Sequence, residues 1–234
     1  MTTTDSRPDS TANARPHSPE RVASLDATFD ALADRQCRVL LRHLDESDDD
    51  TLSVADLAAR LTDAADGTDA KTAENRLLAS LHHTHLPKLA DAGLVNYDAD
   101  RGLVRYRPES RFTAMASTIE SFESADYPVS LDTVFGLFAD FRRRTAYVTL
   151  LRHDDLSLPD LADEVAVAER DEHLPNIDPD DVLEVYLSLY HTHVPKLASA
   201  GLVNYDQEDD YVRLTDTGRA LEPPVRALCE SSDD

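Results

Sequence analysis

The sequence predicts a mainly helical α+β protein made of two tandem copies of one small domain, each copy closing with a β-hairpin. Three observations predict this fold class. One long segment occurs twice, apolar residues recur at helical spacing before each occurrence, and two short strand patterns follow each one. A chain of 234 residues is long enough to form two small hydrophobic cores.

The duplicated segment covers residues 82–98 and returns as residues 190–206. Only three of its seventeen positions differ, and these are His82/Tyr190, Leu86/Val194 and Asp91/Ser199. A repeat has to be recognised before the fold is assigned, and two copies favour tandem domains over a solenoid. The segment itself reads as the end of a helix, a glycine that ends it and the start of a strand.

The repeat and the composition around it predict five regions. Residues 1–22 are polar and lack periodicity, so we expect a disordered tail. The chain then divides into a first domain over 23–108, a linker helix over 109–126, a second domain over 127–222 and an acidic tail over 223–234. The apolar residues of the linker helix could form a dimer surface or clamp the two domains together; these residues are Phe112, Met115, Ile119 and Phe122.

Within each domain, three helices are expected before the hairpin. In the first copy a helix spans 25–44, a second helix opens at Ser53 with a Ser-x-x-acid cap, and a third spans 73–92. The second copy repeats the cap at Ser157. Strands over 94–97 and 103–106 flank a polar turn, as residues 202–205 and 211–214 do in the second copy.

The third helix has a predicted inner and outer face. At 100° per residue, the inner face takes Leu77, Leu78, Leu81, His85, Leu89 and Ala92. Pro87 predicts a kink or a restart near Leu86, because its ring clashes with the carbonyl four residues earlier. We interpret His85 and His193 as core histidines with a backbone partner; the alternative, a metal site in the histidine cluster, lacks neighbouring cysteine ligands.

The third helix is followed by Ala92-Gly93-Leu94-Val95 and then by a hairpin. This order resembles the passage from recognition helix to wing in winged helix-turn-helix regulators of the ArsR and MarR-like kind. The proline, the paired histidines and the tandem arrangement resemble more closely a haloarchaeal family of uncharacterised winged-helix domains, over residues 25–106 and 131–214. The resemblance implies two tandem winged helix-turn-helix domains and a DNA-binding role in transcription regulation.

The net charge of −23 is extreme, with 46 acidic and 23 basic residues and only three lysines. Such a surface resembles that of a protein adapted to molar salt; the alternatives are a DNA mimic or a partner for basic proteins. The domains also differ from one another. Residues 23–111 hold 11 basic and 17 acidic residues, whereas residues 127–222 hold 8 basic and 20 acidic residues. The second domain should therefore repel phosphate more strongly.

The predicted DNA contacts lie in the first domain. The outward side of the third helix would meet bases and the hairpin would meet phosphates. These candidates are Asn75, Arg76, Ser80, His83, Lys88, Arg101 and Arg105. In the second domain Asp180, Asp181 and Glu184 stand in place of Asn75 and Arg76. We therefore expect the first domain to read double-stranded DNA and the second to serve dimerisation or partner binding.

The competing hypothesis is a protein-interaction adaptor whose domains have lost DNA binding. Enzyme activity is not expected, since the chain has no Gly-rich phosphate loop, nucleophile elbow or zinc-hydrolase motif. No cofactor and no metal are expected, and the lone Cys37 and Cys229 give neither a disulfide framework nor a metal motif. Without a signal segment or a long apolar run, we expect a cytoplasmic protein without membrane contact.

Overall fold

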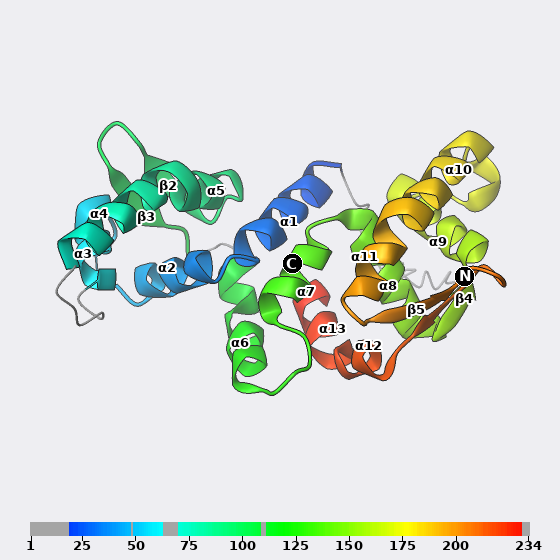
Figure 1. Ribbon diagram of the computed structural model, residues 1–234. Helices are drawn as coiled ribbons and strands as arrows, with labels where there is room; N and C mark the ends of the chain where they lie inside the picture. The colour runs from blue at the N-terminus through cyan, green and yellow to red at the C-terminus, as the bar shows by residue number, and fades with distance from the viewer. Residues whose placement is uncertain (1–18, 48, 63–69, 109–110, 231–234) are drawn as a thin grey trace, which may run out of the picture.

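The structure is a computed structural model that describes residues 19–47, 49–62, 70–108 and 111–230. Figure 1 shows two halves joined by a group of central helices, each half containing helices and one small sheet. The described residues are mostly helical, and both sheets are antiparallel with three strands each. The predicted fold class, a mainly helical α+β protein with two tandem domains, is confirmed.

The first domain follows the predicted order of helix, helix, helix and hairpin. Its elements are α2 (Arg35–Asp45), β1 (Leu52–Ser53), α3 (Val54–Thr62), α4 (Ala70–Ser80), the π turn η1 (Leu81–His85), α5 (Leu86–Asp91), β2 (Val95–Asp98) and β3 (Leu103–Tyr106). The sheet order is β1-β3-β2, with Val95 opposite Tyr106 and Asp98 opposite Leu103.

The second domain repeats this order. Its elements are α7 (Leu131–Phe138), α8 (Phe141–His153), β4 (Asp155–Ser157), α9 (Leu158–Arg170), η2 (Leu174–Asn176), α10 (Pro179–Ser188), the π turn η3 (Leu189–His193), α11 (Val194–Ser199), β5 (Val203–Asp206), β6 (Tyr211–Leu214) and α12 (Asp216–Ala220). The sheet order β4-β6-β5 matches that of the first domain.

The predicted single helix over 25–44 is wrong. The structure has two helices there, α1 (Pro19–Leu32) and α2, because Asp34 adopts an extended conformation and caps α2. Its carboxylate accepts a hydrogen bond from the Gln36 N–H at 2.8 Å. Asp140 does the same between α7 and α8, so the break is a feature of both copies.

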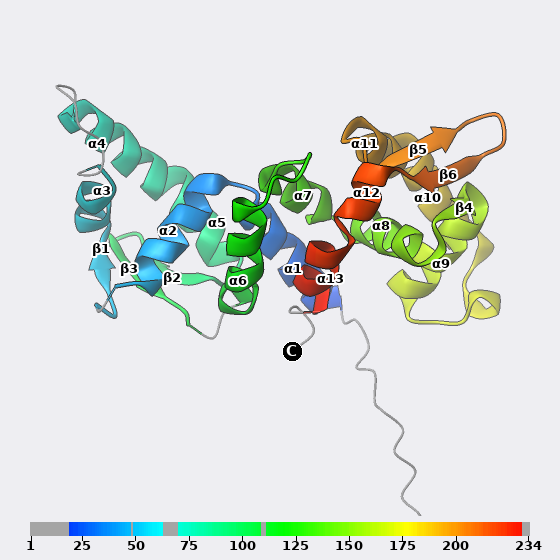
Figure 2. The same ribbon diagram turned by 90° about the horizontal axis from the view of Figure 1, so that it is seen from below.

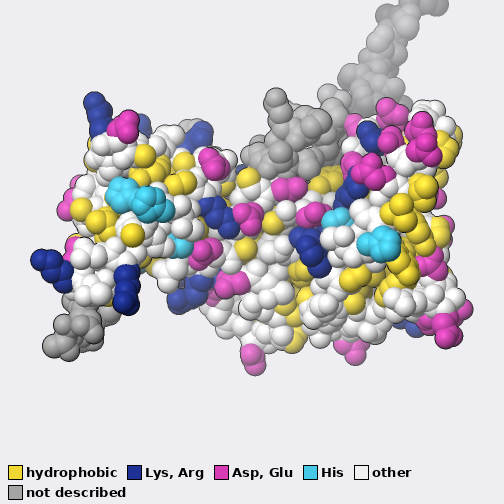
Figure 3. All heavy atoms as spheres, turned by 45° about the horizontal axis from the view of Figure 1, so that its top comes forward, with side chains coloured by type: hydrophobic (Ala, Val, Ile, Leu, Met, Phe, Trp, Pro, Cys, Tyr) yellow, Lys and Arg dark blue, Asp and Glu magenta, His cyan; other side chains and the backbone are white. Residues whose placement is uncertain are grey.

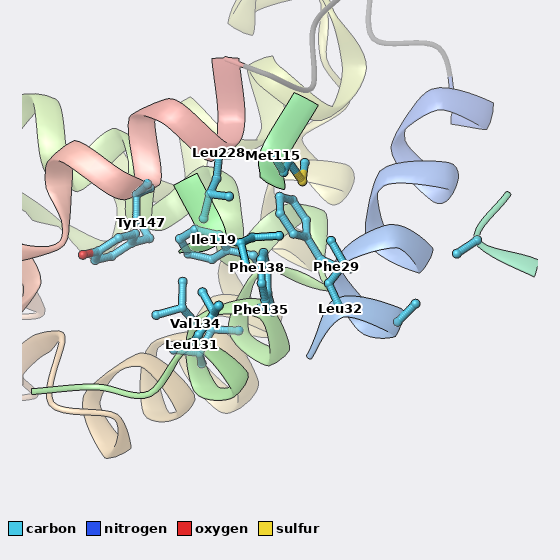
Figure 4. Packing of buried hydrophobic residues seen from close by; sticks show 14 of the residues in the cluster. Phe29, Leu32, Met115, Ile119, Leu131, Val134, Phe135, Phe138, Tyr147 and Leu228 are labelled. Carbon is cyan, nitrogen blue, oxygen red and sulfur yellow. The ribbon is translucent and has the colours of Figure 1, made fainter. Parts of the chain in front are cut away.

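Helices α1 and α7, which are equivalent in the two copies, pack against each other between the two domains (Figure 2). Contact between equivalent elements is what an approximate twofold symmetry produces. Phe29 and Phe135 occupy equivalent positions, 106 residues apart, and their ring centroids lie 5.7 Å apart. Figure 4 shows these rings among apolar side chains from both halves of the chain. Each copy thus contacts the other through the same residues, as in an isologous dimer.

Two buried arginines repeat this symmetry. Arg38 donates to the Leu32 carbonyl and to Asp132, both at 2.7 Å. At the equivalent position, Arg144 donates to the Phe138 carbonyl and to Asp26. Arg38 lies 6.0 Å from the centroid of the Phe135 ring and Arg144 lies 5.3 Å from that of Phe29. The two copies therefore exchange the same ion pairs and cation–π contacts.

The linker and the C-terminal end complete the central layer. Helix α6 (Arg111–Ser124) buries Phe112, Met115, Ile119 and Phe122, and it packs against α13 (Glu222–Glu230) and α7. Glu123 of the same helix pairs with Arg38 and Arg42 of α2, so α6 contacts both halves as the clamp interpretation expects, and its four apolar side chains are buried. The acidic tail expected over 223–234 also needs correction, because Val225 and Leu228 of α13 are buried.

Two further expectations bear on the ends of the chain and on membranes. Helix α1 begins at Pro19, so the part of the expected disordered tail over 19–22 is helical, while residues 1–18 and 231–234 lie outside the described residues. Among the described helices, none combines the length and apolar character that a membrane crossing requires.

Candidate nucleic-acid interface

The third helix of each domain runs through a π turn before its proline. In the first domain the Leu86 N–H donates to the Leu81 carbonyl, five residues earlier. This wider turn accommodates Pro87, which has no N–H and falls in the first turn of α5. The predicted restart near Leu86 is confirmed. The second domain has the same turn, with the Val194 N–H bonded to the Leu189 carbonyl.

A histidine at the end of each π turn lies close to an aspartate that caps another helix of the same domain. Asp34 caps α2 in the first domain and Asp140 caps α8 in the second. His85 is 8% exposed; its Nε2 lies 2.9 Å from Ser80 Oγ and its Nδ1 lies 3.4 Å from Asp34 Oδ2. His193 is 7% exposed, and its Nδ1 lies 3.4 Å from Asp140 Oδ1. The predicted core position is confirmed for both histidines. The predicted backbone partner is wrong, because the neighbouring groups are a capping carboxylate and a hydroxyl.

The two histidines differ in how well their nitrogens are paired. No described atom forms a hydrogen bond with His193 Nδ1, although the Asp140 carboxylate is close. Burial lowers the pKa of His193 below its ordinary value of 6.5, while the charge of Asp140 acts in the opposite direction. The neutral imidazole is therefore favoured in the folded second domain.

Three described side chains of the first domain have the composition of a metal site. The ligand atoms of Asp34, Cys37 and His85 lie within 4.8 Å of one another. Sequence reasoning missed this group, because 48 residues separate Cys37 from His85. Burial raises the pKa of Cys37 to about 12, so the thiol keeps its proton at neutral pH, which opposes metal binding. Arg143 occupies the equivalent of Cys37, so both copies share only the Asp–His pair, which favours a structural role.

Three of the predicted base contacts are exposed on α4 and on the π turn η1 that continues it. Asn75, Arg76 and His83 are exposed, and no ion pair within the described ranges of the first domain includes Arg76. The helix begins at Ala70, which adds exposed Lys71 and Thr72 one turn before Asn75 and Arg76. Both residues lie outside the helix predicted over 73–92. Their spacing of four residues from Asn75 and Arg76 is the sequence pattern that would have placed them on the same side of the helix.

Two predicted contacts are engaged inside the protein instead. Ser80 is half-buried and its hydroxyl contacts His85, so it positions the histidine. Lys88 Nζ lies 3.0 Å from Asp30 Oδ2 of α1, with 32% of the side chain exposed. Lys88 therefore faces α1. Both side chains therefore have a partner inside the first domain, and their contacts with DNA stay predictions.

The hairpin carries the two remaining candidates. Arg101 is 77% exposed in the turn, with its Nε 3.9 Å from Asp98 Oδ2. Arg105 is exposed on β3 directly opposite Asn96 of β2, so both side chains share one side of the hairpin. These positions are suited to phosphate contacts, although Asp98 and Asp100 weaken the local positive potential.

The equivalent surface of the second domain has different chemistry. With the repeated segments aligned, Leu183 stands at Asn75, Glu184 at Arg76 and Leu187 at Ala79. Sequence reasoning identified the acidic residues and missed the leucines. The basic run of the second domain is also occupied: Arg142 pairs with Glu169 and Glu184, Arg143 donates to backbone carbonyls and Arg144 pairs with Asp26.

Comparison with known families matches residues 29–105 and 135–213, more than half of the chain, to the family described as "Domain of unknown function (DUF7344)". The chain belongs to this family. The two DUF7344 regions coincide with the two structural repeats, and they begin at Phe29 and at Phe135, the pair of rings that meet between the copies. Searches of curated proteins and of solved structures returned no match.

Proposed function

We propose that this DUF7344 protein is a transcription regulator that binds double-stranded DNA through its first domain and a protein partner through its second. The observation that carries the proposal is the outward side of the third helix, where Lys71, Asn75 and Arg76 of α4 and His83 of the π turn η1 are exposed. Amide and guanidinium groups on one helix side are the groups that read adenine and guanine in the major groove.

The order of elements supports a winged helix-turn-helix interpretation. In that architecture the recognition helix enters the major groove, while neighbouring elements contact the DNA backbone. In this interpretation α4 is the recognition helix and the β2–β3 hairpin is the wing, as the resemblance to ArsR and MarR-like regulators implies. The approximate twofold symmetry adds support, because many regulators present two equivalent helices to DNA.

The net negative charge of the first domain implies weak non-specific attraction to DNA. Binding should therefore depend on base contacts. The test is selection of sequences from a randomised duplex library with the full chain, followed by anisotropy titration of the selected duplex. Arg76→Ala should weaken binding by about 1–3 kcal/mol, the value of one good bidentate contact. Arg226→Ala, an exposed arginine on α13, is the matched control and should leave affinity unchanged.

A second candidate function, an adaptor that binds only proteins, is favoured by the exposed leucines of α10. Failure of the library to yield any enriched duplex would favour the adaptor. Equal affinity of wild type and Arg76→Ala for a selected duplex would contradict the proposed reading surface.

A further inference from the structure

The largest exposed apolar side chains on a regular helix of the described chain lie on α10. Leu183 and Leu187 are 52% and 44% exposed and stand one turn apart. Half-buried Tyr186 and Tyr190 flank them, with ring centroids 6.3 Å apart and nearly parallel planes. The spacing i, i+3, i+4, i+7 is the pattern by which one helix packs on another. Figure 3 shows apolar side chains forming a stripe along the right-hand half of the molecule.

This apolar stripe is not needed for the fold of the domain. The first domain has the same backbone arrangement, with Asn75 and Ala79 at the positions of Leu183 and Leu187. A different residue of α10, Val185, packs into the core and is 3% exposed. Exposed leucines therefore occur on the copy whose helix is least suited to DNA.

Acidic side chains border the stripe. Asp180 and Glu184 lie on α10, while Glu208 and Asp209 lie in the hairpin turn, and all four are exposed. Glu184 forms an ion pair with Arg142 at 3.1 Å, whereas no ion pair within the described residues involves the other three side chains. The border therefore has a negative potential, which complements a basic partner and opposes phosphate.

Asp210 holds the hairpin against α10. Its carboxylate accepts hydrogen bonds from the Tyr186 hydroxyl at 3.0 Å and from the Tyr205 hydroxyl at 2.5 Å. Its φ of 54° is a left-handed conformation, and Gly102 holds the equivalent position in the first domain. The stripe and its acidic border are therefore fixed before a partner arrives, which reduces the entropy lost on binding.

We infer that this side of α10 binds an amphipathic helix of a partner protein in which arginine or lysine residues flank the apolar side chains. The inference rests on the proposed partner-binding role of the second domain and names the class of partner. A second copy of this chain would oppose acidic border to acidic border. Residues 1–18 contain no Leu, Ile, Val or aromatic residue, and residues 231–234 are acidic or serine, so neither end of the chain supplies the required side chains.

The test uses the full chain and a displayed library of random helical peptides. Bound peptides are counter-selected against a Leu183→Asn/Leu187→Ala variant, which carries the first domain's residues at two exposed positions. Enriched peptides should combine apolar residues at helical spacing with an excess of Arg and Lys. Their affinity should fall at least tenfold on the double variant and by a similar factor on Asp180→Asn/Glu208→Gln/Asp209→Asn. Leu174→Ala, at a 38% exposed leucine outside the stripe, should leave affinity unchanged.

Three results would overturn the inference. One is the absence of peptides that distinguish wild type from the leucine variant. Another is enrichment of apolar peptides without a basic excess. The third is self-association of the chain in sedimentation that the leucine variant abolishes. The Arg76→Ala chain should bind the selected peptides like wild type, so loss of DNA binding and loss of partner binding are separate outcomes.

Discussion

At the scale of residues, single side chains decide which positions tolerate change. Gly218 in α12 is buried, and an added Cβ there would lie 2.2 Å from the Leu202 carbonyl oxygen. Its own carbonyl accepts a hydrogen bond from the Tyr147 hydroxyl at 2.6 Å. Gly136 in α7 is exposed and helical, and no atom lies within 4 Å of an added Cβ. The two glycines therefore have opposite roles.

Gly218→Ala should lower the free energy of unfolding by about 1–3 kcal/mol, as overpacking against backbone does. Gly136→Ala should raise the same quantity by about 0.4–1 kcal/mol, because alanine reduces the entropy of the unfolded chain without strain. Urea denaturation of both variants measures the two changes. Equal midpoints for the two variants would show that the close approach at Gly218 is absent.

The buried His193 predicts a pH dependence of stability. Burial lowers its pKa in the folded state below the ordinary value of 6.5. Between these two pKa values the unfolded state binds more protons, so the free energy of unfolding rises with pH. The contribution of the neutral imidazole is complete above the ordinary pKa and is lost as pH falls below it.

His193→Gln removes this titration. The difference in the free energy of unfolding between wild type and variant should shrink as pH falls from about 7 to about 5, and stay constant at higher pH. Denaturant titrations at a series of pH values provide the measurement. A difference that does not vary with pH would show that His193 has an unshifted pKa.

The sequence predicted burial of individual residues better than their partners. Helical spacing placed His85 and His193 in the core. It could not show that Asp34 and Asp140 would meet them, because those contacts join residues about fifty positions apart, and periodicity reports only on neighbours along one helix.

At the scale of elements, the arginines next to each Asp cap join the two copies. Arg38 is 3% exposed, donates to the Leu32 carbonyl, and pairs with Asp132 and Glu123. Nearby Arg42 is 47% exposed and pairs with the same Glu123. The difference in exposure separates a structural ion pair from a surface one.

Arg38→Met should lower the free energy of unfolding by about 3–5 kcal/mol, because it leaves a carbonyl and carboxylates without their buried partner. Arg42→Met should change it by no more than about 1 kcal/mol, as for exposed pairs. The midpoint of chemical denaturation measures both. Similar losses for the two variants would contradict a special role for the buried arginine.

Predictions of elements succeeded where local signals were strong. Ser53 and Ser157 accept hydrogen bonds at the starts of α3 and α9, and Pro87 marks the restart after the π turn. They failed where tertiary packing decided. The segment of helix α13 was expected to belong to a short acidic tail, yet Val225 and Leu228 are buried in contact with the rest of the chain.

At the scale of the whole molecule, one chain holds two related domains in the arrangement of a symmetric dimer. Histidine side chains of both halves are visible on one side of the molecule in Figure 3. The duplication was evident in the sequence, and the tandem fold followed from it. The symmetric contact was not evident, because a sequence repeat does not indicate which surfaces of the two copies pack against each other.

The central claim is that the two third helices have diverged, one toward DNA and one toward a protein. It is tested most directly by exchanging their outward residues. Asn75→Leu/Arg76→Glu/Ala79→Leu gives the first domain the side chains of the second, and Leu183→Asn/Glu184→Arg/Leu187→Ala does the reverse. Affinity for a selected duplex is then measured with both full-length variants.

The first variant should lose DNA affinity by at least about tenfold, the effect of removing one or more base contacts. The second variant should bind the duplex at least as tightly as wild type. Retained binding by the first variant, or loss of binding confined to the second, would contradict the division of roles.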